Sequence, residues 1–146
     1  MDEHRDAFTP PDPDKERRRR GYEALARITE RHAGGEDRVR WDEYRRPMAP
    51  FDAVRRVSDA AAGSAPPQQG EPAVDREDLT AALSLLPTAR AEFDQMELGV
   101  LEMAKGRGMT WQEIAFGLGL GTAQAARQRH QRLSRRVAPD APGAPS

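Results

Sequence analysis

The last third of the chain places strong helix-starting and helix-ending signals close together, and these signals constrain its fold most. Thr110 and Glu113 form a T-x-x-E pattern, in which a hydroxyl and a carboxylate satisfy the free amides of a helix start. A glycine-rich run follows, and Gly119 is the expected C-cap because a positive φ is needed there. Thr122 is the next expected cap. The sequence therefore predicts a short helix, a glycine-rich turn and a second helix over residues 123–137.

The second of these helices is expected to have two chemically different faces. At about 100° per residue, the inner face is small and apolar apart from one histidine, with Ala126, His130, Leu133 and Val137. The opposite face carries amides and guanidiniums. The whole segment holds five arginines and no acidic residue. Such a composition favours a negatively charged partner over a solvated surface of mixed charge.

Glutamine and arginine are the side chains that read base edges in the major groove of DNA, and arginine also neutralises phosphates. We therefore expect this helix to bind double-stranded DNA. The expected base contacts are Gln124, Arg127, Gln128 and Gln131. The expected phosphate contacts are Thr122, Arg129, Arg132, Arg135 and Arg136.

The arginines also agree with two alternatives to DNA binding. Cations near a helix C-terminus are favourable in any helix, which accounts for Arg132, Arg135 and Arg136. It does not account for the capped first helix, the glycine turn or the absence of acids. Alternatively, the C-terminal helices belong to an adaptor that docks on RNA polymerase, a sigma factor or another regulatory protein. An apolar exposed stripe on the last helix would favour the adaptor, whereas a glutamine-rich outer face favours DNA.

The segment resembles the helix-turn-helix of sigma-factor region 4 and of small actinobacterial DNA-binding regulators. The resemblance is carried by W-x-E-I-A from Trp111, L-G from Leu118 and A-A-R-x-R-x-x-R-L from Ala125, within residues 88–137. It implies a second helix that enters the major groove. Gly121 adds a residue to the turn compared with the sigma pattern. No segment resembles the polymerase-binding region 2 of sigma factors, so a full sigma factor is not implied.

Two more helices are expected before this motif. Residues 88–106 carry an apolar stripe at helical spacing that we interpret as core, at Phe93, Met96, Val100 and Ala104, and Leu101 and Met103 widen it. A shorter amphipathic helix, capped by Asp75, precedes them. Pro87 is expected to separate the two helices because proline removes a backbone hydrogen bond.

The expected organisation is all-α. Residues 1–14 are predicted to be disordered, 15–62 to form a helical N-terminal region, and 63–74 to be a flexible linker rich in proline and glycine. Residues 75–137 would form a helix-turn-helix domain of three to four helices, and 138–146 a disordered tail.

The N-terminal region offers no comparable chemical signal. Its helices are expected at 15–32, at 36–46 and around Phe51 to Ala61, and this region is the candidate contact for a homodimer or a protein partner. Trp41, Tyr44, Phe51 and Val54 are interpreted as a small core or a docking face. The four-arginine run from Arg17 to Arg20 is diluted by neighbouring acids, so we interpret it as a solvated helix start rather than a DNA-backbone arm.

Composition argues against several functional classes. The chain has 37% hydrophobic residues and a mean hydropathy of −0.84, too polar for one core over its whole length. It has no cysteine and three dispersed histidines, and it lacks phosphate-loop, nucleophile-elbow and H-E-x-x-H motifs. No enzyme activity, cofactor or metal is therefore expected. There is no signal-peptide pattern and no membrane-spanning apolar run, so a cytoplasmic, nucleoid-associated location is expected.

The net charge of −1 conceals an asymmetry between the two parts of the chain. Residues 1–87 hold 15 basic and 18 acidic side chains, whereas residues 88–137 hold 8 basic and 5 acidic ones. A module that places positive charge on one helix fits this distribution better than a uniformly basic DNA coat. The sequence thus predicts a bacterial transcriptional regulator or a nucleoid-associated protein.

Overall fold

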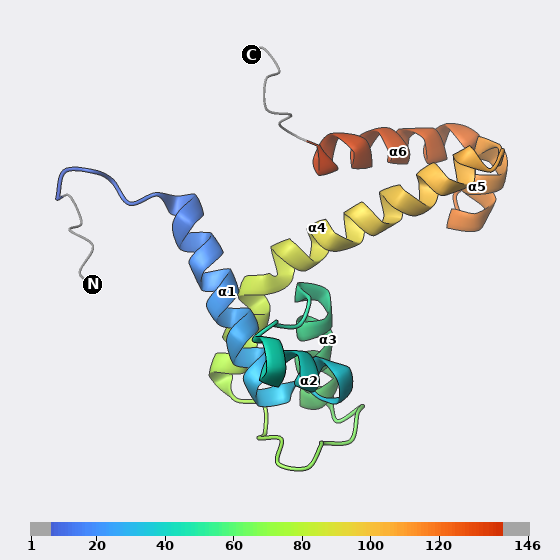
Figure 1. Ribbon diagram of the computed structural model, residues 1–146. Helices are drawn as coiled ribbons and strands as arrows, with labels where there is room; N and C mark the ends of the chain where they lie inside the picture. Colours follow the sequence, from blue (N-terminus) through green and yellow to red (C-terminus); the bar gives the residue numbers. More distant parts are fainter. Residues whose placement is uncertain (1–6, 139–146) are drawn as a thin grey trace. The chain divides into compact units, whose positions relative to one another are not determined.

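The computed structural model describes residues 7–138, which fold into helices with no strand in that range (Figure 1). The expected all-α class is confirmed. The chain divides into two compact units, residues 1–87 and 88–146, and one long helix runs through the boundary. Residues 7–138 contain six helices, α1 (Pro13–His32), α2 (Gly35–Tyr44), α3 (Pro50–Ala62), α4 (Arg76–Gly106), α5 (Trp111–Leu118) and α6 (Ala123–Val137).

Helix α1 begins two residues before its predicted start because the local sequence supplies a complete N-terminal signal. Asp12 caps the helix by accepting a hydrogen bond from the backbone N–H of Asp14 at 3.0 Å, and Pro13 occupies the first helical turn. The other two predicted N-terminal helices are also confirmed, as α2 and α3. Of the two ends predicted to be disordered, residues 1–6 and 139–146 lie outside the described residues.

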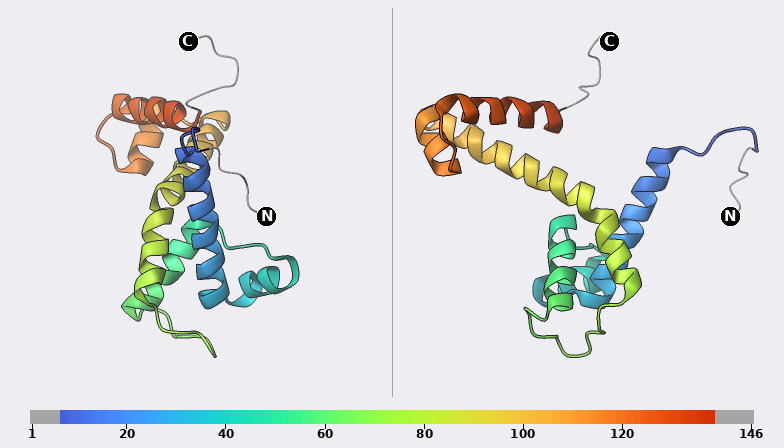
Figure 2. Two further views of the ribbon diagram at one scale, coloured as in Figure 1. Left: turned by 90° about the vertical axis from the view of Figure 1, so that its left-hand side faces the viewer. Right: turned by 180° about the vertical axis from the view of Figure 1, so that it is seen from behind.

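The first unit has its own apolar core. Figure 2 shows the ribbons of the helices that contribute to it. Helix α1 contacts both α2 and α3, and the beginning of α4 adds two further residues to the same core. The buried members are Ala24, Ile28, Ala33, Met48, Ala53, Val57, Ala81 and Leu85. Of the aromatic residues expected to form a small core, Trp41 is buried whereas Tyr44 is 71% exposed.

The structure corrects the prediction that Pro87 separates two helices. Pro87 lies inside α4, which continues from Arg76 to Gly106. Proline removes one backbone hydrogen bond from a helix interior. Packing on both sides offsets this loss, since Leu85 is buried in the first core and Leu101 in the second.

The domain boundary also differs from the sequence prediction. Residues 75–87 pack in the first unit rather than in the C-terminal one, and the division falls after Pro87. Residues 63–74 therefore form a loop within the first unit instead of a linker between domains. Glu71 holds this loop through an ion pair with Arg56, and Val74 packs on the first core.

A buried ionic cluster joins α1 to the start of α4. The carboxylate of Asp78 is fully buried and accepts from His32 Nε2 at 2.9 Å and from Arg31 Nε at 2.9 Å. The other ring nitrogen of His32, Nδ1, lies 3.3 Å from a carboxylate oxygen of Glu71. Asp75 and Asp78 cap the helix reciprocally, each carboxylate accepting from the backbone N–H of the other. Asp75 is thus the cap that the sequence predicts.

Burial of the Asp78 carboxyl opposes its ionisation, but its hydrogen bonds outweigh this effect. Donation from His32, from the backbone N–H of Asp75 and from Arg31 lowers the pKa of Asp78 from 3.8 to about 2. The pKa of Glu71 is also lowered. Burial again acts in the opposite direction, against hydrogen bonds from Arg56, the Gln68 backbone and His32. The cluster therefore stabilises the fold in its charged form.

The second unit is built from the C-terminal part of α4 with α5 and α6. Its buried residues are Leu101, Ile114, Ala115, Ala126 and Leu133. The stripe predicted as core is confirmed for Leu101, which is buried, and for Ala104, which packs on this core. It is wrong for Phe93, Met96, Val100 and Met103, which are 50%, 61%, 56% and 58% exposed. The face of α4 that α5 and α6 cover is centred on Leu101, so most of the predicted stripe lies on a neighbouring face.

Candidate nucleic-acid interface

Helix α5 starts and ends at the residues that its sequence predicts. Thr110 accepts a hydrogen bond from the backbone N–H of Glu113 at 3.1 Å, and its hydroxyl donates to the Glu113 carboxylate at 3.2 Å. Gly119 ends the helix with φ of 72°, the left-handed conformation expected for this position. The buried Ile114 and Ala115 anchor α5 in the core. The helix is therefore held at both ends and along one face.

The turn after α5 fixes where α6 begins. It spans residues 119–122, and Leu120 packs against the core of the second unit. The backbone N–H of Leu120 donates to the carbonyl of Ala115 at 2.8 Å. Thr122 then caps α6 by accepting from the backbone N–H of Ala125 at 3.1 Å. A short turn with both ends hydrogen-bonded leaves α6 little freedom relative to α5.

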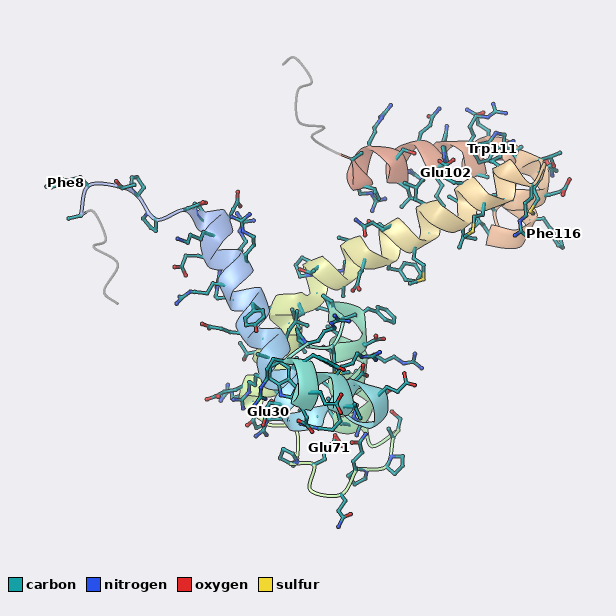
Figure 3. The ribbon with its side chains drawn as sticks, in the orientation of Figure 1. Phe8, Glu30, Glu71, Glu102, Trp111 and Phe116 are labelled. Carbon is teal, nitrogen blue, oxygen red and sulfur yellow. The ribbon has the colours of Figure 1, made fainter. Side chains whose placement is uncertain are left out.

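The inner face of α6 is the one that the sequence predicts. Ala126 and Leu133 are fully buried. His130 is partly buried, with Nε2 at 2.6 Å from the Glu102 carboxylate of α4 and its ring centroid at 5.4 Å from that of Trp111. Figure 3 labels these two partners, Glu102 and Trp111. Lys105 completes this group, with Nζ 4.9 Å from the centroid of the Trp111 ring. These contacts fix the rotation of α6 about its own axis.

The outer face of α6 is exposed over its whole length. All four predicted base-contacting residues are on it: Gln124, Arg127, Gln128 and Gln131. Three of the predicted phosphate-contacting arginines are exposed as well, at Arg132, Arg135 and Arg136. The helix contains no acidic residue, so no carboxylate of α6 itself neutralises these cations. The outer face of α6 is therefore positively charged and also carries the side-chain amides of its glutamines.

Two of the predicted phosphate contacts are engaged within the protein. Arg129 Nε donates to the Glu97 carboxylate of α4 at 2.7 Å, and Arg129 is only half-exposed. Arg136 Nη1 lies 3.5 Å from the Asp94 carboxylate, also on α4. Arg129 therefore links α6 to α4, and its phosphate contact stays a prediction. Arg136 remains mostly exposed, and its ion pair is long.

The acidic residues of α4 that contact α6 were not singled out from the sequence. Asp94, Glu97 and Glu102 recur at helical spacing, which places them on one face of α4. That periodicity was present in the sequence. Pairing these acidic residues with Arg129, His130 and Arg136 would also have required the prediction that α6 lies along α4.

Comparison of the chain with models of known protein families, with curated proteins and with solved structures found no match. The described residues contain no group of three or more histidine, cysteine, aspartate or glutamate side chains placed to hold a metal ion. Within residues 7–138, no helix is long and apolar enough to cross a membrane. Function is therefore inferred from the chemistry of α6 and of the residues that support it.

Proposed function

We propose that the second unit binds double-stranded DNA, with α5, the turn and α6 acting as a helix-turn-helix and α6 as its recognition helix. The observation that carries the proposal is the exposed, acid-free face of α6, on which glutamines and arginines lie together. An α-helix fits the major groove, where amides and guanidiniums bond to adenine and guanine edges. This function makes the protein a transcriptional regulator or a nucleoid-associated protein of the cytoplasm.

The ion pairs of α6 refine the roles of its side chains. Bases are approached by Gln124, Arg127, Gln128 and Gln131. Arg132 and Arg135 hold phosphates, and Arg136 joins them when the backbone of DNA competes with Asp94 for its guanidinium. Thr122 contributes through the start of α6, because a capped helix N-terminus directs its amides and its dipole toward a phosphate. Arg129 acts indirectly by holding α6 against Glu97.

A second candidate function is an adaptor that binds another regulatory protein. The observation in its favour is on α5, where Phe116 is 87% exposed and Met109 just before the helix is 37% exposed. Large exposed apolar side chains are typical of protein contacts when they lie together. The last helix itself carries no exposed apolar stripe, which is the feature that would have favoured the adaptor over DNA. DNA binding is therefore the function that we prefer.

A binding titration on the full chain tests the proposal through two arginines with different roles. Fluorescence anisotropy with a labelled duplex library, followed by selection of preferred sequences, measures both affinity and sequence choice. Arg127→Ala is expected to weaken binding to the preferred sequence by about 1–3 kcal/mol and to relax the choice at one position. Arg135→Ala is expected to weaken binding to all sequences alike. Equal affinity of both variants and the unmodified chain for DNA would contradict the proposal.

A further inference from the structure

His32 is a buried histidine of α1 whose two ring nitrogens both face carboxylates. Nε2 lies 2.9 Å from Oδ2 of Asp78, in the first turn of α4. Nδ1 lies 3.3 Å from Oε2 of Glu71, in the loop of residues 63–74. The side chains of His32 and Asp78 are 0% exposed, and that of Glu71 is 4% exposed. The ring therefore bridges the loop and α4 at a place that is closed to bulk solvent.

The charge of the two carboxyls decides how many protons the ring must carry. Burial opposes the ionisation of Asp78 and Glu71, but the hydrogen bonds that they accept lower the pKa of both, to about 2 in Asp78. Both are therefore charged near neutral pH, and a charged carboxylate only accepts hydrogen bonds. To bind both, each ring nitrogen must donate, and only the imidazolium form of histidine has two N–H donors. A neutral ring would place a nitrogen lone pair against a buried negative charge, which costs free energy.

The carboxylates keep their charge when the ring loses a proton, because arginines bind them too. The cluster that holds His32 contains Arg27 and Arg31 of α1, Arg56 of α3, Glu71 of the loop, and Asp75 and Asp78 of α4. Arg31 Nε donates to Asp78 at 2.9 Å, and Arg56 Nη2 donates to Glu71 at 2.6 Å. When the pH rises above neutrality, the ring is thus the group of this cluster that loses a proton.

Glu71 also organises the loop that contains it. The backbone N–H of Gln68 donates to the Glu71 carboxylate at 3.3 Å, and the backbone N–H of Glu71 donates to the carbonyl of Gln68 at 3.0 Å. The Gln68 side chain covers Gly34 at the junction of α1 and α2, where an added Cβ atom would overlap its amide. Residues 68–72 line a cleft of about 590 Å³ together with residues of this junction. Displacement of Glu71 from His32 would therefore change both the contact with Gly34 and the cleft.

We propose that His32, Glu71 and Asp78 form a proton-dependent clamp that holds the loop of residues 63–74. The clamp is closed when both ring nitrogens carry protons and bind both carboxylates. When the pH rises, Nδ1 loses its proton to the solvent, and the Glu71 carboxylate moves away from the lone pair that remains. Because the closed clamp binds one proton more than the open one, a rise in pH favours the open loop. All three residues belong to the first unit, so the clamp does not depend on the proposed DNA binding.

The hydrogen bond from His32 to Asp78 is the one that survives deprotonation. It is the shorter of the two hydrogen bonds of the ring. Asp78 is also held in the first turn of α4 by Arg27, by Arg31 and by the backbone N–H of Asp75. Glu71 instead lies in a loop, so it can move without a change in the backbone of any helix. The clamp therefore opens at its Glu71 end.

A pH titration of the isotope-labelled full chain by nuclear magnetic resonance tests the clamp. Long-range nitrogen–proton correlations show which ring nitrogens carry protons, and His4→Gln and His130→Gln identify the signals of His32. Both nitrogens of His32 are expected to be protonated at about pH 5, and only Nε2 at about pH 10. A single protonated nitrogen at the lower pH, loss of the proton from Nε2 instead of Nδ1, or two protons throughout would overturn the proposal.

The contact between Gln68 and Gly34 reports the position of the loop in the same titration. A nuclear Overhauser effect between carbon-bound protons of the two residues is suitable because these protons do not exchange with solvent. It is expected while both ring nitrogens are protonated and should be lost with the same midpoint as the Nδ1 proton. If it persisted after Nδ1 had lost its proton, the loop would not be released and the proposal would be wrong.

Two variants separate the clamp from a general effect of charge. Glu71→Gln retains the size of the side chain and can donate an N–H to the neutral ring, so the contact between Gln68 and Gly34 is expected to persist when His32 titrates. Glu77→Gln removes an acid that binds Arg27 but is 79% exposed, and it is expected to release the loop as the unmodified chain does. Loss of the contact in both variants alike would overturn the proposal. The unmodified chain by itself shows whether the loop is released, so the test does not depend on the folding of either variant.

Discussion

Arg129 of α6 is hydrogen-bonded to Glu97 of α4 at 2.7 Å, and this pair divides the arginines of α6 into two groups. Arg129 and Arg136 form ion pairs with carboxylates of α4 and so hold α6 against α4, and the ion pair of Arg136 is the longer of the two. Arg127, Arg132 and Arg135 are exposed and have no acidic neighbour on their own helix. If all five arginines of α6 pointed into solvent, the helix would carry the same charge, but no ion pair would hold it in one orientation on α4. The ion pairs fix which face of α6 points outward.

A double-mutant cycle is expected to show that Arg129 and Glu97 stabilise the second unit. Their coupling should be about 0.5–1 kcal/mol in the free energy of unfolding, because the pair is only partly shielded from water. Arg135→Ala should change that free energy by less than about 0.5 kcal/mol, as is usual for an exposed side chain. Urea denaturation measures both quantities. A zero coupling energy would show that α6 is held by its apolar face alone.

The caps of α5 and α6 should each contribute to stability. Thr110→Ala and Thr122→Ala remove the hydroxyls that accept from Glu113 and Ala125, which is expected to cost about 1 kcal/mol each. Thr122→Ser keeps the acceptor and should restore most of the loss. The measurement is the free energy of unfolding from urea denaturation. If Thr122→Ala and Thr122→Ser were equally unstable, the methyl group rather than the cap would carry the effect.

Two glycines of the α5 segment should respond to alanine in opposite directions. Gly119 has φ of 72°, so Gly119→Ala forces a side chain into the left-handed region and should destabilise the protein by about 1 kcal/mol. Gly117 is inside α5 with open space around it, so Gly117→Ala should stabilise by about 0.5–1 kcal/mol. Thermal unfolding of both variants measures the difference. Stabilisation by both substitutions would mean that the turn does not need Gly119.

The stability of the first unit should fall in acid because of Asp78. Its pKa is lowered from 3.8 to about 2 in the folded protein, against burial, through hydrogen bonds from His32, the Asp75 backbone and Arg31. A group with a lowered folded pKa stabilises fully above its unfolded pKa, and this contribution is lost as the pH falls through the folded value. The free energy of unfolding should therefore drop by on the order of 2 kcal/mol between about pH 4 and pH 2.

Asp78→Asn tests whether this carboxylate is the source of the acid sensitivity. The variant should be less stable at pH 7 by about 3 kcal/mol, since it leaves the charged partners of a buried group unmatched. Its stability should also depend less on pH between about 4 and 2 than that of the unmodified chain. Glu23→Gln, on an exposed position of α1, is the matched control and should change neither property. If the free energy of unfolding fell equally with pH in the unmodified chain and in Asp78→Asn, the acid sensitivity would come from other carboxylates.

Local signals in the sequence were sufficient to place most helices. The caps Thr110, Thr122 and Asp75 and the C-cap Gly119 act within a few residues, so their hydrogen bonds follow directly from the sequence. The inner face of α6 was also predictable, because helical periodicity is a local property of the sequence. The bounds of α5 and α6 agree with the prediction. These features depend little on which other elements pack nearby.

Features that depend on packing between distant residues were not predictable in this way. Periodicity identified an apolar stripe at Phe93, Met96 and Val100, widened by Leu101, but could not say which side of this stripe the rest of the second unit would cover. The ion pair of Arg129 required knowledge of that same packing. Pro87 was expected to end a helix by its local effect, and burial of Leu85 and Leu101 on either side overrode it. Tertiary packing decided all three outcomes.

The salt dependence of DNA binding by the full chain tests the central claim most directly. Affinity for a random duplex is measured by fluorescence anisotropy at several salt concentrations, for the unmodified chain and for Arg135→Ala. We predict a linear fall of log affinity with log salt concentration, and a slope smaller by about one unit in Arg135→Ala, because one phosphate contact is lost. Absence of binding by the unmodified chain even at low salt would contradict DNA recognition by α6 and would favour the adaptor, with a protein as the partner of the C-terminal helices.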